Sequence, residues 1–264
     1  MKKFLAVLTA VLIAVPSFEV AAWGRKGHET IAKIAERNLT ERAKERIERY
    51  LGGHSIVYYA KWMDEYRHTD EYGFTTSWHM TPIDSELRYT DELLDPAKGN
   101  AIYGIELATE NLRDYASASD STVNVNLKYL IHLVGDMHCP AHLSFIGRKN
   151  DYDVWIYDIY GRPERLSIHL VWDNGVIEVT RVWSVSEWAG ELDRCTAEQK
   201  AEMSAGTPRD WVHDAARCCE IKLDMSEPDA YLGQDFFNKS LPLIESQILK
   251  AGYRLAALLN SLFD

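Results

Sequence analysis

The segment HLVGDMHCPAH, from His132 to His142, places three histidines and one aspartate within eleven residues. Histidine titrates near neutral pH and is the commonest transition-metal ligand, and carboxylate oxygens can join two cations. His132 and Asp136 are four residues apart, so on a helix both side chains project from one face about one turn apart. His142 follows Pro140, where that helix is expected to end, and it can therefore face a different cation. The segment predicts a metal site.

Other candidate ligands are spread along the chain. A second pair with the same spacing occurs in SIHLVWD, where His169 precedes Asp173 by four residues. Upstream candidates are Asp64 in AKWMDEYR, His79 in TSWHMTP and His28 in WGRKGH. Each of these residues alone is compatible with a surface pair or a hydrogen-bonded core histidine, but their combination favours metal binding. The remaining histidines have no such context, and we interpret His138 as structural and His54, His68 and His213 as background.

The first 22 residues have the features of a secretory signal peptide. MKK is a basic start, FLAVLTAVLIAV is an apolar core, and SFEVAA is a cleavage segment of small residues that ends at Ala22. The apolar run is too short to span a bilayer, and a retained interfacial anchor is the alternative. We therefore expect a signal peptide over residues 1–22. The mature protein would begin at Trp23, carry no membrane segment and be periplasmic or secreted.

The mature chain, residues 23–264, is long enough for one large domain with a buried core. Loss of Lys2, Lys3 and Glu19 with the leader changes the formal net charge from −11 to −12. This acidic balance argues against bulk electrostatic binding of duplex phosphates, because no basic stripe is present. Bound divalent cations would neutralise part of the charge.

Four cysteines predict one or two disulfides in an exported protein: Cys139, Cys195, Cys218 and Cys219. Cys218 and Cys219 are neighbours and cannot easily pair with each other. A bridge from one of them to Cys195 or Cys139 is therefore expected. Zinc–thiolate binding is the alternative, although the sequence has no CxxC pair.

Most of the chain has helical periodicity. Residues 27–51 repeat apolar positions at helical spacing, with a break near residues 38–40, and the same period recurs in residues 101–116, 123–138, 184–192, 208–221 and 241–263. Residues 153–168 are instead rich in β-branched and aromatic side chains around Gly161-Arg162-Pro163, which indicates a hairpin. The sequence predicts a mainly α protein, a single all-helical domain with one short β-hairpin.

The motifs WGRKGH, WMDEYR, WH, HLVGDMHCPAH and IHLVWD, in that order, resemble the zinc-dependent single-strand-specific nucleases of the S1/P1 type. The resemblance covers almost the whole mature chain. It implies a trinuclear zinc nuclease domain over residues 23–264, with three Zn²⁺ per chain and a distant similarity to zinc phospholipase C.

The resemblance also implies nine metal ligands in three groups. The first group is Trp23, through its α-amino nitrogen and carbonyl oxygen, together with His28. The second group is Asp64, His79 and His132, with Asp136 bridging the first two ions. The third group is His142, His169 and Asp173. An acylated amine is a poor ligand, so the uncleaved precursor should not complete the first group.

The resemblance assigns catalytic or substrate-binding roles to a few further positions. Asp64 and Asp136 would serve catalysis as metal ligands. Arg67 matches the phosphate-binding arginine of the family. The alternative for Arg67 is a salt bridge with Glu65 or Asp70. Asn174 matches an asparagine that contacts the base in fungal members. Met80 stands where an aromatic residue often stacks on the base, which leaves base preference open.

The sequence also departs from the family pattern at three other places. HCPAH replaces the usual HQPLH, GRKNDYDV replaces a loop rich in glycine and asparagine, and Ser167 replaces an asparagine.

The implied reaction is hydrolysis of phosphodiester bonds in single-stranded DNA or RNA to 5′-phosphorylated products, and 3′-nucleotides are a further expected substrate. Single strands are favoured because a recessed metal cluster reaches a phosphate only where the flanking base can be splayed away. No protein partner is implied. One alternative is a zinc phospholipase C, whose first histidine comes later in the chain and whose last ligand is typically glutamate. The other is a non-catalytic zinc-binding exported protein.

Overall fold

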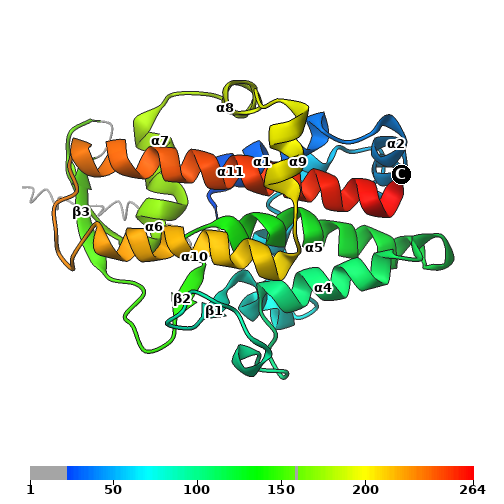
Figure 1. Ribbon diagram of the computed structural model, residues 1–264, viewed down its shortest axis with the longest axis horizontal. Coiled ribbons are helices and arrows are strands. Elements are labelled where there is room, and N and C mark those ends of the chain that lie inside the picture. Colours follow the sequence, from blue (N-terminus) through cyan, green and yellow to red (C-terminus); the bar gives the residue numbers. More distant parts are fainter. Residues whose placement is uncertain (1–22, 158–159) are drawn as a thin grey trace, which may run out of the picture.

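The computed structural model describes residues 23–157 and 160–264, most of which are helical (Figure 1). The predicted signal peptide, residues 1–22, lies outside the described residues. In chain order the α-helices are α1 Arg25–Arg37, α2 Glu41–Tyr50, α3 Trp62–Tyr66, α4 Ala101–Leu112, α5 Asp120–His138, α6 Ile168–Leu170, α7 Val176–Thr180, α8 Val185–Leu192, α9 Ala197–Ser204, α10 Pro208–Asp224 and α11 Gln234–Phe263. The shorter turns are the 3₁₀ segments η1 Ile56–Tyr59, η2 Gly73–His79, η3 Asp91–Leu93 and η4 Tyr115–Ser117, and the π segment η5 Val171–Gly175.

The mainly helical fold class is confirmed, and so are several predicted helix boundaries. The break near residues 38–40 separates α1 from α2, where the Thr40 side chain accepts a hydrogen bond from the Ala43 amide and caps α2. Helix α5 ends at His138, before Pro140, as the sequence predicts. No helix of the described residues combines the length and the apolar character that crossing a membrane requires.

Two small sheets complete the fold. The strands β3 Asp153–Tyr157 and β4 Pro163–Ser167 form the predicted antiparallel hairpin. A parallel pair, β1 Thr81–Ile83 and β2 Leu143–Phe145, is an element that the sequence did not predict, because three residues are too few to show a strand pattern. This strand pair positions two candidate ligands, because β1 begins two residues after His79 and β2 begins directly after His142. The Thr81 amide donates a hydrogen bond to the His142 carbonyl at 2.9 Å, which fixes the two histidine segments side by side.

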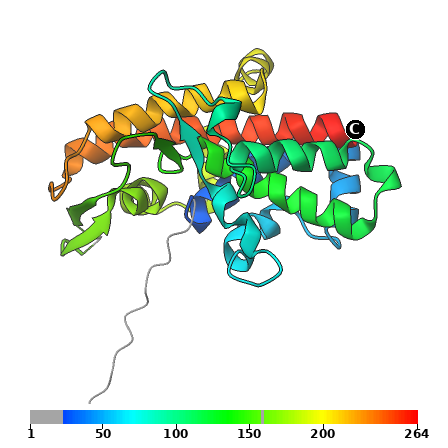
Figure 2. The same ribbon diagram turned by 90° about the horizontal axis from the view of Figure 1, so that it is seen from below.

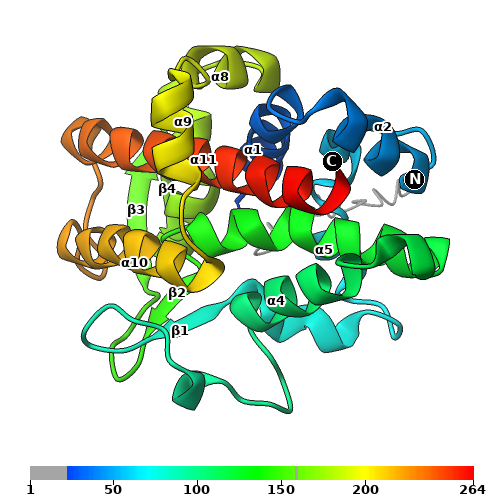
Figure 3. The ribbon, with the colours of Figure 1, turned by 45° about the vertical axis from the view of Figure 1, so that its right-hand side comes forward.

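Helix α5 is the centre of the molecule. It contacts α1, α4, α10 and α11, and Figure 3 shows it running between α4 and the long helix α11. Every residue from Tyr129 to His138 is buried, so this half of the helix is covered on all sides. Figure 2 shows α10 and α11 lying along the length of the molecule, with the β3–β4 hairpin toward one end. His132 and Asp136 are therefore carried into the core by the helix that organises it.

The contact of α1 with α5 depends on a glycine. A Cβ atom at Gly135 would lie 2.8 Å from the Nδ1 atom of His28, closer than real Cβ contacts. The missing side chain lets α1 approach α5 and places His28 directly against it. The Trp23 indole also contacts α5 at this residue, because its Nε1 donates a hydrogen bond of 2.8 Å to the Gly135 carbonyl.

Candidate metal centre

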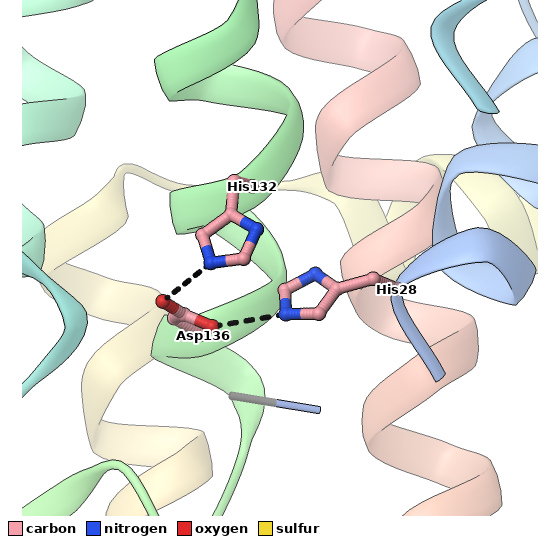
Figure 4. A group of neighbouring side chains, drawn as sticks. All are labelled: His28, His132 and Asp136. Atoms are coloured by element: carbon pink, nitrogen blue, oxygen red, sulfur yellow. Dashed lines mark ion pairs between the residues drawn. The ribbon is translucent and has the colours of Figure 1, made fainter. Parts of the chain in front are cut away.

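The first group of side chains combines one residue from α1 with two from α5. His28, His132 and Asp136 are fully buried and point toward one another (Figure 4). The distance from His28 Nε2 to Asp136 Oδ1 is 3.1 Å, and the distance from His132 Nε2 to Asp136 Oδ2 is 3.2 Å. The two imidazole rings stack with centroids 4.0 Å apart. These ligand atoms lie within 4.8 Å of one another, as binding to one ion requires.

The second group shares His132 with the first and adds one residue from α3 and one from η2. Nδ1 of His79 and Nε2 of His132 each lie 3.7 Å from Oδ1 of Asp64 and 3.2 Å from each other. His79 Nδ1 is also 2.8 Å from Asp136 Oδ2. The two oxygens of Asp136 therefore face different histidines: Oδ1 faces His28, and Oδ2 faces His79 and His132. This carboxylate lies between the two groups, where it could join two cations.

The third group lies where α5 ends and the segment from α6 to η5 passes beside it. His142 Nε2 is 3.5 Å from Asp173 Oδ1, and His169 Nε2 is 3.9 Å from Asp173 Oδ2. The thiol of Cys139 donates a hydrogen bond of 3.2 Å to Asp173 Oδ1. His169 and Asp173 are four residues apart as noted from the sequence, but the turn between them passes into the π segment η5.

Hydrogen bonds to the backbone orient two of the imidazoles. His132 Nδ1 donates to the Ala60 carbonyl at 2.8 Å, and His142 Nδ1 donates to the His79 carbonyl at 2.6 Å. A proton held on Nδ1 leaves the Nε2 lone pair directed into the cluster, which is the tautomer that a metal ligand needs.

Many buried polar atoms in the three groups make no hydrogen bond. They are both ring nitrogens of His28, Oδ1 of Asp64, Nε2 of His79, both oxygens of Asp136, Nε2 of His142, Nε2 of His169 and Oδ2 of Asp173. Buried polar groups without partners are costly, and their accumulation at one place needs an explanation. All of them are imidazole nitrogens or carboxylate oxygens, the donor set that zinc takes in proteins. The residues present therefore fit bound metal ions.

Trp23 lies at the junction of the first and third groups. Its side chain is fully buried, and the next amide, that of Gly24, donates a hydrogen bond of 2.9 Å to the Asp173 carbonyl. A Cβ atom at position 24 would lie 1.6 Å from Oδ1 of Asn174, so any other residue there would displace the Asn174 side chain. These contacts hold the Trp23 indole beside Gly135, which precedes Asp136, and the backbone that follows Trp23 beside Asp173.

Burial keeps most of the histidines of these groups neutral in the metal-free protein. Burial lowers the pKa of His28 to about 4 and that of His142 to about 3. It also lowers the pKa of His169 to about 4. Burial alone would lower the pKa of His132 as well, but Asp136 and Asp64 outweigh it and raise that pKa. A neutral imidazole is the form that binds a metal, so His28, His142 and His169 are ready to act as ligands.

The carboxylates respond to their positive neighbours. Burial raises the pKa of Asp136, but His132 and His142 outweigh it and hold this pKa well below its usual range. His132 and Lys61 similarly outweigh burial at Asp64 and bring its pKa to about 2. At Asp173 burial outweighs the hydrogen bond from Cys139 and the attraction of Lys61, so its pKa is raised well above the ordinary value, and Asp136 and Asp64 add to the rise.

The metal-free protein is expected to lose stability as the pH falls from 6.5 toward 4. His28, His142, His169 and the structural His138, whose pKa burial and Arg254 lower to about 3, all have folded-state pKa values below 6.5. Below pH 6.5 the unfolded chain takes up protons that the folded chain does not, so the free energy of unfolding falls. The lowered pKa of His79 adds to this fall, whereas the raised pKa values of Asp173 and Glu245 act in the opposite direction in this window.

Thermal unfolding of chelator-treated protein would measure this effect. We expect a melting temperature at pH 5 at least about 3 °C below that at pH 7. The variant His54→Gln, which removes an exposed histidine outside the three groups, should show the same fall. An equal or higher melting temperature at pH 5 would contradict the neutral-histidine interpretation.

The residues predicted to contact substrate lie around these groups. Arg67 follows α3, its side chain is 12 % exposed, and its Nη1 lies 3.7 Å from Asp64 Oδ1. Met80 is half-buried directly after His79, at the end of η2. Asn174 follows Asp173 and lines a cavity of about 550 Å³ between the β3–β4 hairpin and α7. The structure thus brings the nine predicted ligands and Arg67 into one region.

Sequence reasoning was wrong about the disulfides. All four cysteines are free. Their thiols have other neighbours, because Cys139 Sγ contacts Asp173, Cys219 Sγ contacts the Leu143 carbonyl and Cys218 accepts a hydrogen bond from Gln247. Spacing alone carries no information on which buried thiols meet, so an even number of cysteines in an exported chain was a weak signal.

Sequence reasoning also missed two residues of the site. Lys61 donates a hydrogen bond from Nζ to Asp64 Oδ2, a helical neighbour three residues away that the sequence could have indicated. Cys139 lies in the third group with His142 and Asp173. The replacement of HQPLH by HCPAH was the available signal for this residue.

Comparison with known proteins decides the family. The family model for the S1/P1 nucleases matches residues 23–264, from Trp23 to the last residue. The chain belongs to the S1/P1 nuclease family. Among its relatives, Nuclease S1 of Aspergillus oryzae is 27 % identical over 271 residues, covering 90 % of this chain and 91 % of its own length. Endonuclease 4 of Arabidopsis thaliana is 26 % identical over 279 residues, which is 92 % of this chain and 89 % of that protein. Nuclease P1 of Penicillium citrinum is 25 % identical over 269 residues, with coverages of 91 % and 97 %.

Membership of the S1/P1 family makes the protein a nuclease that hydrolyses nucleic acids. The family match therefore favours a nuclease over a zinc phospholipase C. The three buried groups of histidine, aspartate and cysteine are consistent with metal sites of such an enzyme.

Proposed function

We propose that the protein is a three-zinc nuclease that hydrolyses phosphodiester bonds in single-stranded DNA and RNA and leaves 5′-phosphorylated products. The 3′-phosphate of 3′-nucleotides would be a second substrate. The observation that carries the proposal is the position of Asp136, whose two oxygens face the histidines of two adjoining groups. A carboxylate shared between two buried ligand groups is the arrangement that a pair of hydrolytic metal ions requires.

The residues divide into three proposed sites. Trp23, His28 and Asp136 would hold one ion, and Asp64, His79, His132 and Asp136 a second. His142, His169 and Asp173 would hold the third. Bound zinc would supply Lewis-acid activation of a water and charge stabilisation of the phosphate.

The protein's own side chains would orient the substrate. Arg67 lies at the edge of the second group and carries a planar guanidinium that can donate two parallel hydrogen bonds to a phosphate. Its contact with Asp64 ties its position to the ligand group. Asn174, which lines the cavity beside the hairpin, offers both an amide donor and an acceptor to a base edge. Burial of the groups favours single strands, because a duplex keeps its bases stacked and its phosphates on a stiff surface.

Chelation and readdition of metal test this proposal. We expect degradation of a single-stranded oligonucleotide to stop after chelation and to return with Zn²⁺, with a matched duplex cut much more slowly. Mass spectrometry of the fragments should show 5′-phosphate and 3′-hydroxyl ends. Metal-independent cleavage, or products with 3′-phosphates, would contradict the proposal. Phosphatidylcholine serves as a control substrate that should remain intact.

Arg67→Ala is expected to lower kcat/KM about 100-fold, roughly 2.7 kcal/mol of transition-state stabilisation, with the zinc content unchanged. Arg67→Lys should restore only part of the loss, because an ammonium group cannot reproduce the planar fork. The control is Arg165→Ala on β4, where the guanidinium pairs with Asp153 and Asp229 away from the three groups. An unchanged kcat/KM in Arg67→Ala would exclude a phosphate contact at this residue.

We also propose that residues 1–22 are removed as a signal peptide and that the mature enzyme is periplasmic or secreted. The family match beginning at Trp23 supports this proposal. Mass spectrometry of protein recovered outside the cytoplasm should give an amino terminus at Trp23, and a retained leader would contradict it.

A further inference from the structure

The third group contains a thiol that the predicted ligand set does not use. Cys139 is fully buried at the end of α5, and its Sγ lies 3.2 Å from Oδ1 of Asp173. Nε2 of His142 lies 3.5 Å from the same oxygen. The ligand atoms of these three residues are all within 4.8 Å of one another. A sulfur, a nitrogen and an oxygen donor thus converge on one point.

The two separations from Asp173 Oδ1 are within a few tenths of an ångström of the edges of a zinc coordination tetrahedron. With a zinc–sulfur distance of about 2.3 Å and zinc–nitrogen and zinc–oxygen distances of about 2.0–2.1 Å, neighbouring nitrogen and oxygen ligands lie roughly 3.3–3.4 Å apart, and sulfur lies roughly 3.5–3.6 Å from either. A hydrogen bond from the thiol to Asp173 would account for the contact with Oδ1 alone. It would leave His142 Nε2 and Asp173 Oδ2 buried and without hydrogen bonds. A cation among the three residues accounts for all of these atoms together.

A fourth donor lies next to this set. The rings of His142 and His169 have centroids 4.9 Å apart, and Nε2 of His169, also without a hydrogen bond, is 3.9 Å from Asp173 Oδ2. His169 comes from α6, whereas Cys139 and His142 come from the end of α5 and the turn that follows it. The four side chains therefore join two distant parts of the sequence.

We propose that Cys139 is the fourth protein ligand of the third zinc ion and binds it through its sulfur together with His142, His169 and Asp173. This inference rests on the proposed zinc occupancy. On binding, the Sγ–H bond breaks, the proton passes to solvent and a sulfur–metal bond forms, with no change of oxidation state. The third site then has four protein ligands.

A four-ligand site has a functional consequence. Structural zinc sites are closed by protein ligands, whereas catalytic sites keep a position for water or substrate. The third ion would therefore join the residue that follows α5 to Asp173 of η5 through protein ligands. A sulfur donor also favours zinc over magnesium or calcium at this site.

X-ray absorption at the zinc edge tests the inference on the mature, fully loaded protein. We expect a zinc–sulfur distance of about 2.3 Å, with one sulfur for every three zinc ions. After replacement of zinc by Co²⁺, a thiolate-to-cobalt charge-transfer band should appear in the near ultraviolet. Both signals should vanish in Cys139→Ser and in Cys139→Gln, which restores the residue common in the family. Cys218→Ser and Cys219→Ser, which change the two buried thiols of α10, should keep both signals.

The possible results separate this inference from the proposed function. Three zinc ions without a zinc–sulfur signal would overturn the role of Cys139 and leave the proposed nuclease mechanism intact. A charge-transfer band that survives in Cys139→Ser would overturn it as well. A protein that binds no zinc would refute both proposals. Should the Cys139 variants fail to fold, a zinc–sulfur signal that persists in the Cys195→Ser/Cys218→Ser/Cys219→Ser triple variant would identify Cys139 as the thiolate, because it is the one cysteine left.

Discussion

Asp136→Asn is expected to abolish nuclease activity, lowering kcat by at least about 1,000-fold, or about 4 kcal/mol of transition-state stabilisation. Oδ1 of Asp136 faces His28 at 3.1 Å and Oδ2 faces His79 at 2.8 Å, so both oxygens are needed to join the first two groups. An amide keeps the shape of the carboxylate but replaces one oxygen with a nitrogen that cannot bind a cation. One of the paired ions should be lost.

Steady-state kinetics and elemental analysis together measure this effect. The zinc content of Asp136→Asn should fall from three to two or fewer atoms per chain. The matched control is Asp193→Asn, because the Asp193 side chain is only 4 % exposed but pairs with Arg37 and Lys200, outside the three groups. The control should keep three zinc atoms and near-normal turnover. An Asp136→Asn protein with three zinc atoms and near-normal turnover would contradict the proposed role of Asp136 as a shared ligand.

One extra residue before Trp23 is expected to lower turnover at least about 100-fold. The proposal uses the free α-amino nitrogen of Trp23 as a ligand, and an amide nitrogen has no lone pair available for a metal. The position of Trp23 is fixed independently, by the bond from its indole to the Gly135 carbonyl and by the bond from the Gly24 amide to the Asp173 carbonyl. The added residue therefore cannot be accommodated by moving Trp23 without breaking these buried contacts.

The effect is measured by comparing two proteins released from a fusion by cleavage. One starts at Trp23, and the other has a single alanine before Trp23. The extended form should also bind one zinc ion fewer. A third protein with the same alanine added after the exposed Asp264 controls for the cleavage procedure and should behave as the unextended one. Equal zinc content and equal turnover in the first two proteins would show that the amino terminus is not a ligand.

Much of the fold and of the candidate site follows from local patterns in the sequence. The helical spacing of His132 and Asp136 requires both to project from one face, and the structure places them there on α5. Pro140 ends this helix where expected and directs His142 toward another group. The hairpin of residues 153–167 was visible because its strands are long enough to show their composition. These features depend on residues close in sequence.

Features that depend on distant residues were not predictable in this way. The parallel pair β1–β2 joins segments about 60 residues apart, and neither strand is long enough to show a pattern. The widened turn at η5 changes the geometry between His169 and Asp173, which spacing alone describes as an ordinary helix turn. The placement of Cys139 beside Asp173 likewise joins residues 34 positions apart, at the end of α5 and in η5. The grouping of ligands from five segments was reached only through the resemblance to a family.

Crystal diffraction from the mature protein, collected on both sides of the zinc absorption edge, tests the central claim most directly. Three anomalous peaks per chain are expected: one among His28, Asp136 and the Trp23 amino terminus, one among Asp64, His79 and His132, and one beside Asp173. The first two should share Asp136 as a ligand. Fewer peaks at these positions, or peaks elsewhere with Asp136 bound to no metal, would contradict it.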